Sequence, residues 1–526
     1  MSQHILSIIW LTPLVGMIAV MCLPKGSKDL IRYVANGFAA LGLLVTIPMI
    51  RAFDSSSADF QLVERHDWIP ALGAQYYLGI DGFGYLMILL TVVVGWLSIL
   101  CSWSSIQERV KEYYAFFLFL QAGMLGVFMV LDVFLFYVFW EIMLVPMYFI
   151  IGIWGGGRRL YAAIKFFLYT LAGSVLMLLG MLTVYFKHYE QFGHYSFALE
   201  DLLRVAAYTG PDLQFWLFWA FFVAFAVKVP MFPFHTWLPD AHTEAPTAGS
   251  VILAGILLKM GLYGLVRFAM PLFPKGATDE LTVQLVALLS IVGIVYGALV
   301  SLMQTDWKRL VAYSSVSHLG FCTLGLIALN PNGIAGGMLQ GLNHGLSTPL
   351  LFLAVGVVYD QRHTREISEY GGLANRMPVY TVLFAIALFA SMGMPGLNGF
   401  IGEFTILRGA FEVSIWWAGF AVLGIVLGAA YLLWLFQRVM LGPITNPKNE
   451  AVKDMNLREI LVMAPLVAGC FWIGLYPKPC FEILEPPTNR LVERLDPGYF
   501  SRNAAPPEDE AAPLARLLPA GAPASR

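Results

Sequence analysis

The sequence predicts an all-α polytopic membrane protein with about fourteen transmembrane helices. First, 58% of its 526 residues are hydrophobic, only 13% are charged and the mean hydropathy is +0.71, whereas soluble domains carry about 25% charged residues. Second, apolar stretches long enough to cross a hydrocarbon core of roughly 30 Å recur along the chain. Third, the connections between these stretches are too short to hold a separate soluble domain.

We place the spans by windowed hydropathy and expect them to form one membrane domain over residues 1–477. A polar, Pro/Ala-rich tail follows over residues 478–526, and its composition predicts disorder beyond about Arg502. In chain order, the predicted spans lie near 5–23, 30–50, 79–102, 113–131, 132–153, 162–186, 212–234, 247–271, 281–303, 308–329, 334–359, 378–410, 414–440 and 459–477.

Cationic residues mark alternate connections between the spans, which the positive-inside rule assigns to the cytoplasm. An even number of spans then places both termini on the periplasmic side of a bacterial inner membrane. No basic n-region or cleavage signal precedes the first span, so we expect this span to stay in the mature protein. The cations of these connections are Lys25, Lys28, Arg32, Arg109, Lys111, Arg158, Arg159, Lys308, Arg309, Arg362, Arg365, Arg376, Lys448, Lys453 and Arg458.

Two predicted spans carry helix breaks. Pro230 follows Lys228 in the seventh span, and the twelfth contains Pro395 and Gly396 within the run GMPGLNG. Proline removes a backbone donor, and irregular backbone at membrane depth is tolerated only beside protein or a water-filled cavity. Because the breaks lie five spans apart, the pattern predicts two five-helix repeats, spans 4–8 and 9–13, which the odd number of spans inverts relative to each other.

Six titratable side chains are predicted at membrane depth. A charged residue at the centre of a span costs about 2.5–3.5 kcal/mol on insertion scales, so such residues usually mark an ion or proton pathway. They are Glu141 in the fifth span, Lys228 in the seventh, Lys259 in the eighth, His318 in the tenth, His344 in the eleventh and Glu403 in the twelfth.

These side chains suggest a proton path. The proton affinity of a buried lysine depends on its distance from a carboxylate, so Lys228 and Glu141 are a candidate switch. Histidine titrates near neutral pH, and His318 and His344 are candidate relays from Lys259. Polar residues inside membranes also join helices by hydrogen bonds, so a passive scaffold stays open as an alternative.

Several other site types are not expected. The net charge of −2, without a basic run, argues against nucleic acid as a partner. The five cysteines lack the spacing of zinc, haem or iron–sulfur motifs. His235 and His242, seven residues apart across a proline, lack metal-site geometry. We therefore expect no metal and no cofactor in this chain.

One long segment resembles a known family. Residues 225–264, FAVKVPMFPFHTWLPDAHTEAPTAGSVILAGILLKMGLYG, resemble the signature of the antiporter-like subunits of proton-pumping NADH:quinone oxidoreductase, respiratory complex I. Residues 306–320, 343–367 and 394–404 are similar to later blocks of the same family. The resemblance therefore covers most of the chain except its tail.

The resemblance implies a non-redox subunit of a translocase, with NADH, FMN, iron–sulfur clusters and quinone in partner subunits. It implies that Glu141 and Lys228 form a coupled pair, Lys259 is central and Glu403 faces the exit. A glutamate at position 403, and a chain that stops soon after the last span, resemble the subunit M (mitochondrial subunit four) type. Partners would be other complex I membrane subunits, including paralogous antiporter-like ones, and lipids. A subunit of a multisubunit Na⁺/H⁺ antiporter or a membrane-bound hydrogenase is the alternative, and proton versus sodium stays open.

Overall fold

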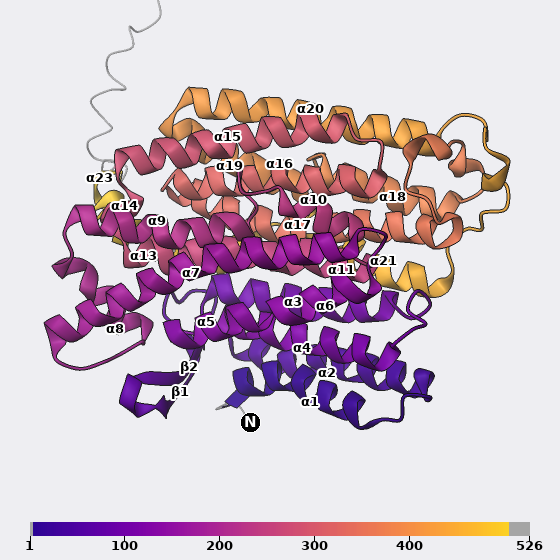
Figure 1. Cartoon of the computed structure of the whole chain (residues 1–526). Coiled ribbons are helices and arrows are strands. Elements are labelled where there is room, and N and C mark those ends of the chain that lie inside the picture. Colours follow the sequence, from indigo (N-terminus) through magenta and orange to yellow (C-terminus); the bar gives the residue numbers. More distant parts are fainter. Residues whose placement is uncertain (1–3, 504–526) are drawn as a thin grey trace, which may run out of the picture.

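Long helices run side by side across the molecule, as the sequence predicts (Figure 1). The computed structural model describes residues 4–503. Within this range, twelve helical segments are long and apolar enough to span a membrane. They are α1 (Ile5–Cys22), α2 (Lys28–Ala52), α3 (Gly82–Cys101), α4 (Val110–Met129), α5 (Val133–Ile142) with α6 (Leu144–Trp154), α7 (Arg159–Phe192), the stretch from α11 (Thr247–Ile252) through α12 (Leu258–Gly264) to α13 (Met270–Leu272), α15 (Glu280–Leu302), α16 (Trp307–Ile327), α17 (Pro331–Arg362), α20 (Ile415–Met440) and α21 (Leu457–Leu475).

The two remaining predicted spans are the ones with breaks, so fourteen is not confirmed as the count. α9 (Pro211–Lys228) ends at Lys228, and turns containing Pro230 separate it from α10 (Trp237–Glu244). α18 (Pro378–Ser391) and α19 (Asn398–Val413) are separated by Pro395 and Gly396. Gly396 has φ +91°, a left-handed conformation that favours glycine. The two interruptions are therefore present where the sequence predicts them.

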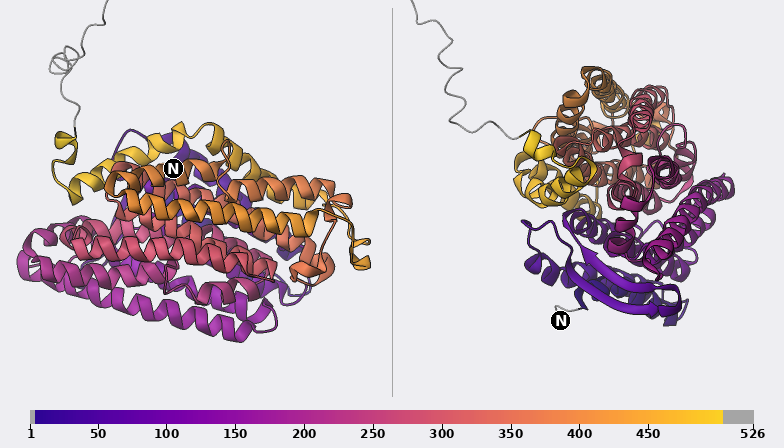
Figure 2. Two further views of the ribbon diagram at one scale, coloured as in Figure 1. Left: turned by 90° about the horizontal axis from the view of Figure 1, so that it is seen from above. Right: turned by 90° about the vertical axis from the view of Figure 1, so that its left-hand side faces the viewer.

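The most deeply buried helices lie in the middle of the bundle. The apolar segments of α17 and of the α11–α13 stretch are 100% buried, and that of α16 is 94% buried, whereas those of α2 and α21 are 28% buried. In the end-on view the N-terminal helices lie to one side of this core and the later helices to the other (Figure 2). Lys259, His318 and His344, which lie along the middle of these helices, are therefore enclosed by protein.

A hairpin interrupts the otherwise helical fold and was not predicted. β1 (Gln61–Ile69) pairs antiparallel with β2 (Ala74–Ile80) in the connection before α3. The turn contains Gly73 at φ +66°, where an added Cβ would lie 2.1 Å from the carbonyl oxygen of Tyr195. The hairpin thus fits closely against the segment after α7, at the left-hand end of Figure 1.

The segment assigned to the tail begins with an ordered helix. α22 (Lys478–Leu495) packs against α17 and α3, and Arg494 donates to the carbonyls of Pro271 at 2.6 Å and Leu203 at 2.7 Å. The packed part of the chain therefore continues past residue 477, and α23 (Tyr499–Arg502) follows. Apart from Asn503, the residues expected to be disordered beyond Arg502 lie outside the described range. Shorter helices α8 (Leu199–Val205) and α14 (Pro274–Ala277) complete this end.

The cation-bearing connections gather at the opposite end of the bundle. Hydrogen bonds join these connections to one another, which places them on one face as the charge pattern predicts. The bonds run from Lys28 to Gln107, from Lys111 to Leu23, from Trp154 to Glu108, from Arg158 to Glu244 and from Arg365 to Thr243. We call this the cation-bearing face.

Glycine allows α9 and α12 to approach closely. A Cβ at Gly261 would lie 2.6 Å from Cγ2 of Val229 and 2.8 Å from the carbonyl oxygen of Phe225. We expect Gly261→Ala to lower stability by about 1–3 kcal/mol, as overpacking does in other cores. The thermal unfolding midpoint of the purified assembly measures this loss. Gly37→Ala on α2, where no atom lies within 4 Å, is the control and should leave the midpoint unchanged or higher.

Candidate functional site

Lys259 and His344 form a direct contact in the core. Nζ of Lys259 lies 2.6 Å from Nδ1 of His344 and donates to the carbonyl oxygen of Ala254 at 2.5 Å. Lys259 is 1% exposed and His344 is 2% exposed. At this distance the two nitrogens are within hydrogen-bond reach, so a protonated lysine can donate to an unprotonated Nδ1, and a protonated Nδ1 can donate to a neutral lysine.

The helix that carries Lys259 is irregular on both sides. Two wide π-helical turns, η4 (Leu253–Leu257) and η5 (Leu265–Ala269), flank α12. Such turns are frequent at functional sites. Ala254, whose carbonyl accepts from the lysine, lies in η4. Gly341 of α17 faces α12, and an added Cβ there would lie 3.0 Å from Cδ1 of Leu262 and 3.8 Å from Cγ of Lys259. The absence of a side chain at Gly341 lets the two helices approach.

His318 and Glu403 form a second buried contact, nearer the C-terminal half. Nδ1 of His318 on α16 lies 3.1 Å from Oε1 of Glu403 on α19. The same carboxylate oxygen accepts from Nε2 of Gln340 at 3.2 Å. The hydroxyl of Tyr431 on α20 lies 3.4 Å from Nε2 of His318. Both nitrogens of this imidazole therefore have a polar neighbour.

The two contacts lie close to each other. The ring centroids of His344 and His318 are 6.0 Å apart, with the rings steeply inclined at 61°. Among the described residues Nε2 of His344 has no hydrogen-bond partner. The structure therefore brings four of the six predicted residues, Lys259, His344, His318 and Glu403, into one series.

The break before α19 holds Glu403 in place. Nδ2 of Asn343 donates to the carbonyl of Asn398 at 2.7 Å, and Nδ2 of Asn398 donates to the carbonyl of Asn343 at 3.2 Å. This reciprocal pair fastens the first residue of α19 to α17. Gly393, at φ +75° in the break, lies so close that an added Cβ would be 2.5 Å from Oε2 of Glu403. The break thus makes room for the carboxylate.

Glu141 and Lys228 do not touch. Within residues 4–503 the two form no ion pair, and Nζ of Lys228 and Oε1 of Glu141 have no hydrogen-bond partner. Lys228, only 1% exposed, instead lies 5.1 Å from the ring centroid of Trp140 and 5.8 Å from that of Phe166. These aromatic faces stabilise an ammonium group by cation–π attraction. The lysine is therefore held in an aromatic pocket, apart from the predicted carboxylate.

Two buried polar residues were named in the sequence analysis but not counted among the groups at membrane depth. His242, with no exposed surface, stacks on Phe352 at 4.6 Å, and neither of its ring nitrogens has a partner among the described residues. Lys308, counted as a loop cation, is 6% exposed and donates to the carbonyl of Ala245. A histidine or lysine inside a membrane span is the sequence signal for such a group. Both residues lie near the ends of predicted spans, so this signal was not seen for them.

A third unpredicted group lies at the opposite end of the lysine helix. Arg267 forms an ion pair with Asp81 at the start of α3, and its Nε donates to the hydroxyl of Tyr263 at 3.0 Å. That hydroxyl donates to the carbonyl of Phe128 at 3.1 Å. This network fastens the α11–α13 stretch to α3 and α4.

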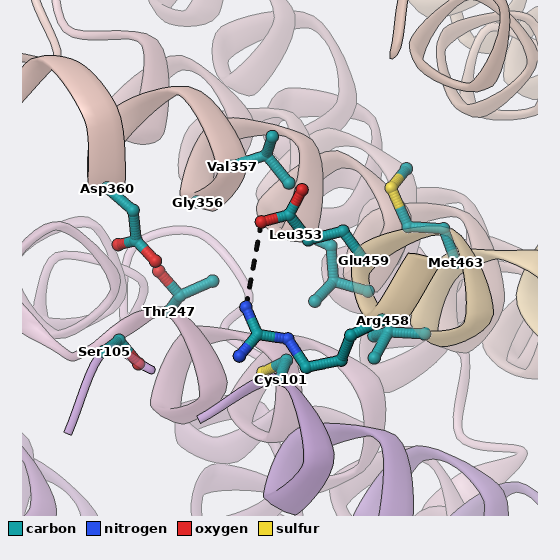
Figure 3. A pocket seen from close by; sticks show the side chains of 11 residues that line it. Cys101, Ser105, Thr247, Leu353, Gly356, Val357, Asp360, Arg458, Glu459 and Met463 are labelled. Atoms are coloured by element: carbon teal, nitrogen blue, oxygen red, sulfur yellow. Dashed lines mark ion pairs between the residues drawn. The ribbon is translucent and has the colours of Figure 1, made fainter. Parts of the chain in front are cut away.

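A small cavity lined by polar and apolar side chains lies between α17 and α21, near the cation-bearing face (Figure 3). Its volume is about 30 Å³, enough for a water molecule. Asp360 of α17 and the pair Arg458 and Glu459, whose charged atoms are 3.7 Å apart, supply its polar groups. Thr247, the first residue of α11, also lines it. The cavity therefore lies at the end of the helical stretch that carries Lys259.

The chain is similar to proteins of one family over most of its length. A family model described as NADH:quinone oxidoreductase/Mrp antiporter, TM, matches residues 130–428. NADH-quinone oxidoreductase subunit M of Rhodobacter capsulatus is 45% identical, with 93% of this chain and 97% of that protein covered. NADH-ubiquinone oxidoreductase chain 4 of Arabidopsis thaliana is 43% identical, with 92% and 96% covered.

Solved structures show the same fold. A chain of respiratory complex I from Thermus thermophilus with bound NADH matches with a TM-score of 0.84 and 30% identity, covering 93% of this chain and 99% of that one. A chain of the Mrp complex from Dietzia sp. matches with a TM-score of 0.81 and 19% identity, covering 94% and 99%. The second likeness is one of fold alone.

Proposed function

The chain belongs to the NADH:quinone oxidoreductase/Mrp antiporter membrane family, and from this premise we propose that it is a proton-translocating subunit of the membrane arm of respiratory complex I. The observation that carries the proposal is the buried series Lys259, His344, His318 and Glu403. Its relatives at 41–45% identity are subunit M or chain 4 of NADH–quinone or NADH–ubiquinone oxidoreductases. Partners are then the other membrane subunits, antiporter-like paralogues included, and lipids.

In this proposal the chain moves protons and carries no redox group. NADH, FMN, iron–sulfur clusters and quinone belong to partner subunits. A proton held by Lys259 or His344 passes to His318, whose ring centroid lies 6.0 Å from that of His344. From His318 it passes to Glu403, which lies 3.1 Å away. Each step moves only a proton between nitrogen and oxygen atoms, so no covalent chemistry is required.

The direction of transfer follows from the charge pattern. We assign the cation-bearing face to the cytoplasm of a bacterium, whose inner membrane then holds the protein with both termini in the periplasm. Proton uptake begins at the cavity lined by Asp360 and Glu459 on that face. Release proceeds from Glu403 to the opposite face.

Glu141 and Lys228 supply the control step. The aromatic pocket of Lys228 stabilises its charged form, and a neighbouring subunit that moves Glu141 toward or away from it changes that stability. When redox turnover in the partner subunits moves Glu141, Lys228 loses its proton, and that proton then reaches Lys259. In this proposal Glu141 has one position near Lys228 and one position away from it, and the separated pair described above is the second.

Removing either member of this pair tests the proposal. In Lys228→Ala and Glu141→Ala we expect the number of protons pumped per NADH oxidised to fall severalfold in the assembled complex, measured as acidification in reconstituted vesicles. The exposed pair Lys187 and Glu190, whose charged atoms are 2.6 Å apart, provides matched alanine controls that keep wild-type pumping. Full pumping in both core variants would support a passive scaffold instead.

One alternative is a subunit of a multisubunit Na⁺/H⁺ antiporter, which the description of the matching family model includes, or of a membrane-bound hydrogenase. Genes for quinone-reducing subunits beside this gene favour complex I, whereas a cluster of antiporter genes alone favours the antiporter. Ion measurements separate the transported species. Sodium movement without a pH change would exclude the proton.

A further inference from the structure

We propose that His188, His194 and Asp201 form a binding site for a divalent transition-metal ion of the zinc class, at the end of the bundle opposite the cation-bearing face. One potential ligand atom of each residue lies within 4.8 Å of the others. Two imidazoles and a carboxylate are ligands that Zn²⁺ prefers. Such a site lies outside the buried proton series and is independent of it.

The local backbone brings the two histidines together. α7 ends at Phe192, and Gly193 caps it at φ +73°, with its N–H donating to the carbonyl of Tyr189 at 2.9 Å. This left-handed turn reverses the chain, so His194 comes back beside His188 on the last turn of the helix. Their ring centroids are 4.9 Å apart at 87°.

Each histidine is oriented through one ring nitrogen. Nδ1 of His188 lies 3.1 Å from the carbonyl oxygen of His194, and Nδ1 of His194 lies 3.2 Å from that of Phe192. An imidazole that donates from Nδ1 keeps the lone pair of Nε2 for a metal. Metal-binding histidines are commonly held in this way by a carbonyl or carboxylate.

The carboxylate is also held in place. Asp201 lies in α8, and its Oδ2 accepts from the hydroxyl of Ser196 at 2.8 Å. Arg204 approaches its other oxygen only to 3.7 Å, and this arginine side chain is 65% exposed, so it is free to turn away. Exposed ion pairs of this kind contribute about 0–1 kcal/mol, a small barrier to a metal.

The segment between the ligands is fixed to the rest of the protein. Phe197 stacks on Tyr185 at 4.1 Å, and its N–H donates to the carbonyl of Gly73 in the hairpin at 3.2 Å. Ala198 pairs with Asp132 as an isolated β-bridge. A tetrahedral zinc ion with ligand bonds of about 2.0–2.2 Å holds its ligand atoms about 3.3 Å apart. The exposed His194 has to move by only about 1.5 Å or less to close the site.

Zinc binding to the assembled complex tests the site. Complex treated with a chelator is titrated with Zn²⁺ alone, and bound zinc is counted by elemental analysis. We expect wild type to bind one equivalent more than His194→Ala, His188→Ala or Asp201→Asn. Ser196→Ala removes the hydrogen bond to the carboxylate and the one that the Ala198 N–H donates to this hydroxyl. This variant should still bind the additional zinc, with an affinity about 10–100-fold lower.

His66→Ala is the matched control. This histidine is also exposed at the same end, but among the described residues it belongs to no group of three potential metal ligands. It should bind as much zinc as wild type. X-ray absorption of the additional equivalent should show nitrogen and oxygen ligands, including imidazole. Equal zinc content in wild type and His194→Ala overturns the proposal. Because His194 is exposed, this variant is expected to assemble normally, and neither result depends on proton pumping.

Discussion

Replacing Lys259 with alanine is expected to reduce proton pumping coupled to NADH oxidation by about tenfold to a hundredfold, since a hydrogen bond to a charged group is worth about 1.5–3 kcal/mol and each 1.4 kcal/mol is a factor of ten. In the proposed path Lys259 is the group from which His344, 2.6 Å away, receives a proton. Without the lysine, the imidazole has no titratable neighbour on the side of α12. The measurement is the ratio of protons pumped to NADH oxidised by the assembled complex in vesicles.

Two further variants separate proton transfer from packing. Lys259→Arg keeps a positive charge, but a guanidinium does not release a proton in proteins, so we expect pumping to stay low. Lys275→Ala removes an exposed lysine from α14 and should pump as wild type does. Normal pumping in Lys259→Ala would show that the central lysine holds helices together and nothing more.

Glu403→Gln is expected to lower pumping about tenfold while the complex still assembles. Glutamine has nearly the same shape and still accepts a hydrogen bond, but it neither carries charge nor takes up a proton. His318 then loses the only carboxylate with which it pairs in the described chain. A loss of about 1.4 kcal/mol in transition-state stabilisation corresponds to this factor.

Matched changes on the same helix define this effect. Glu403→Asp restores a carboxyl group one methylene farther from His318, and we expect partial recovery of pumping. Glu412→Gln changes a more exposed glutamate of α19 that accepts from Asn332 at 2.7 Å, and pumping should not change. Equal losses in Glu403→Gln and Glu403→Asp would point to packing as the role of the residue.

The sequence identified the buried charges because burial of charge in a membrane is costly. Lys259, His344 and Glu403 stand out in apolar segments for this reason alone. Their pairing is another matter: Lys259 and His344 are 85 positions apart, as are His318 and Glu403. Such contacts depend on which helices pack together and how each helix is rotated about its axis. A hydropathy profile gives neither of these. The pairing of Glu141 with Lys228, expected from the buried charges and also implied by the family resemblance, is not a contact in this structure.

Polar residues of ordinary appearance were missed for a related reason. Gln340 and Tyr431 occur in many membrane helices as packing groups, so their types gave no signal, yet both lie next to the His318 and Glu403 contact. The histidines of the proposed metal site lie six residues apart, and only the left-handed turn at Gly193 brings them together. The helix breaks were easier to predict, since proline acts on its own backbone.

Gln340, Asn343 and His344 all belong to one turn of α17, and they bind Glu403, Asn398 and Lys259 in turn. Lys259 at one end of the series and Glu403 at the other are therefore both positioned by α17. This helix has 32 residues, which is about 48 Å at 1.5 Å per residue. A small tilt of α17 at either membrane surface therefore moves the partners of Lys259 and of Glu403 together. Substitutions at positions 340 and 344 should for this reason combine non-additively.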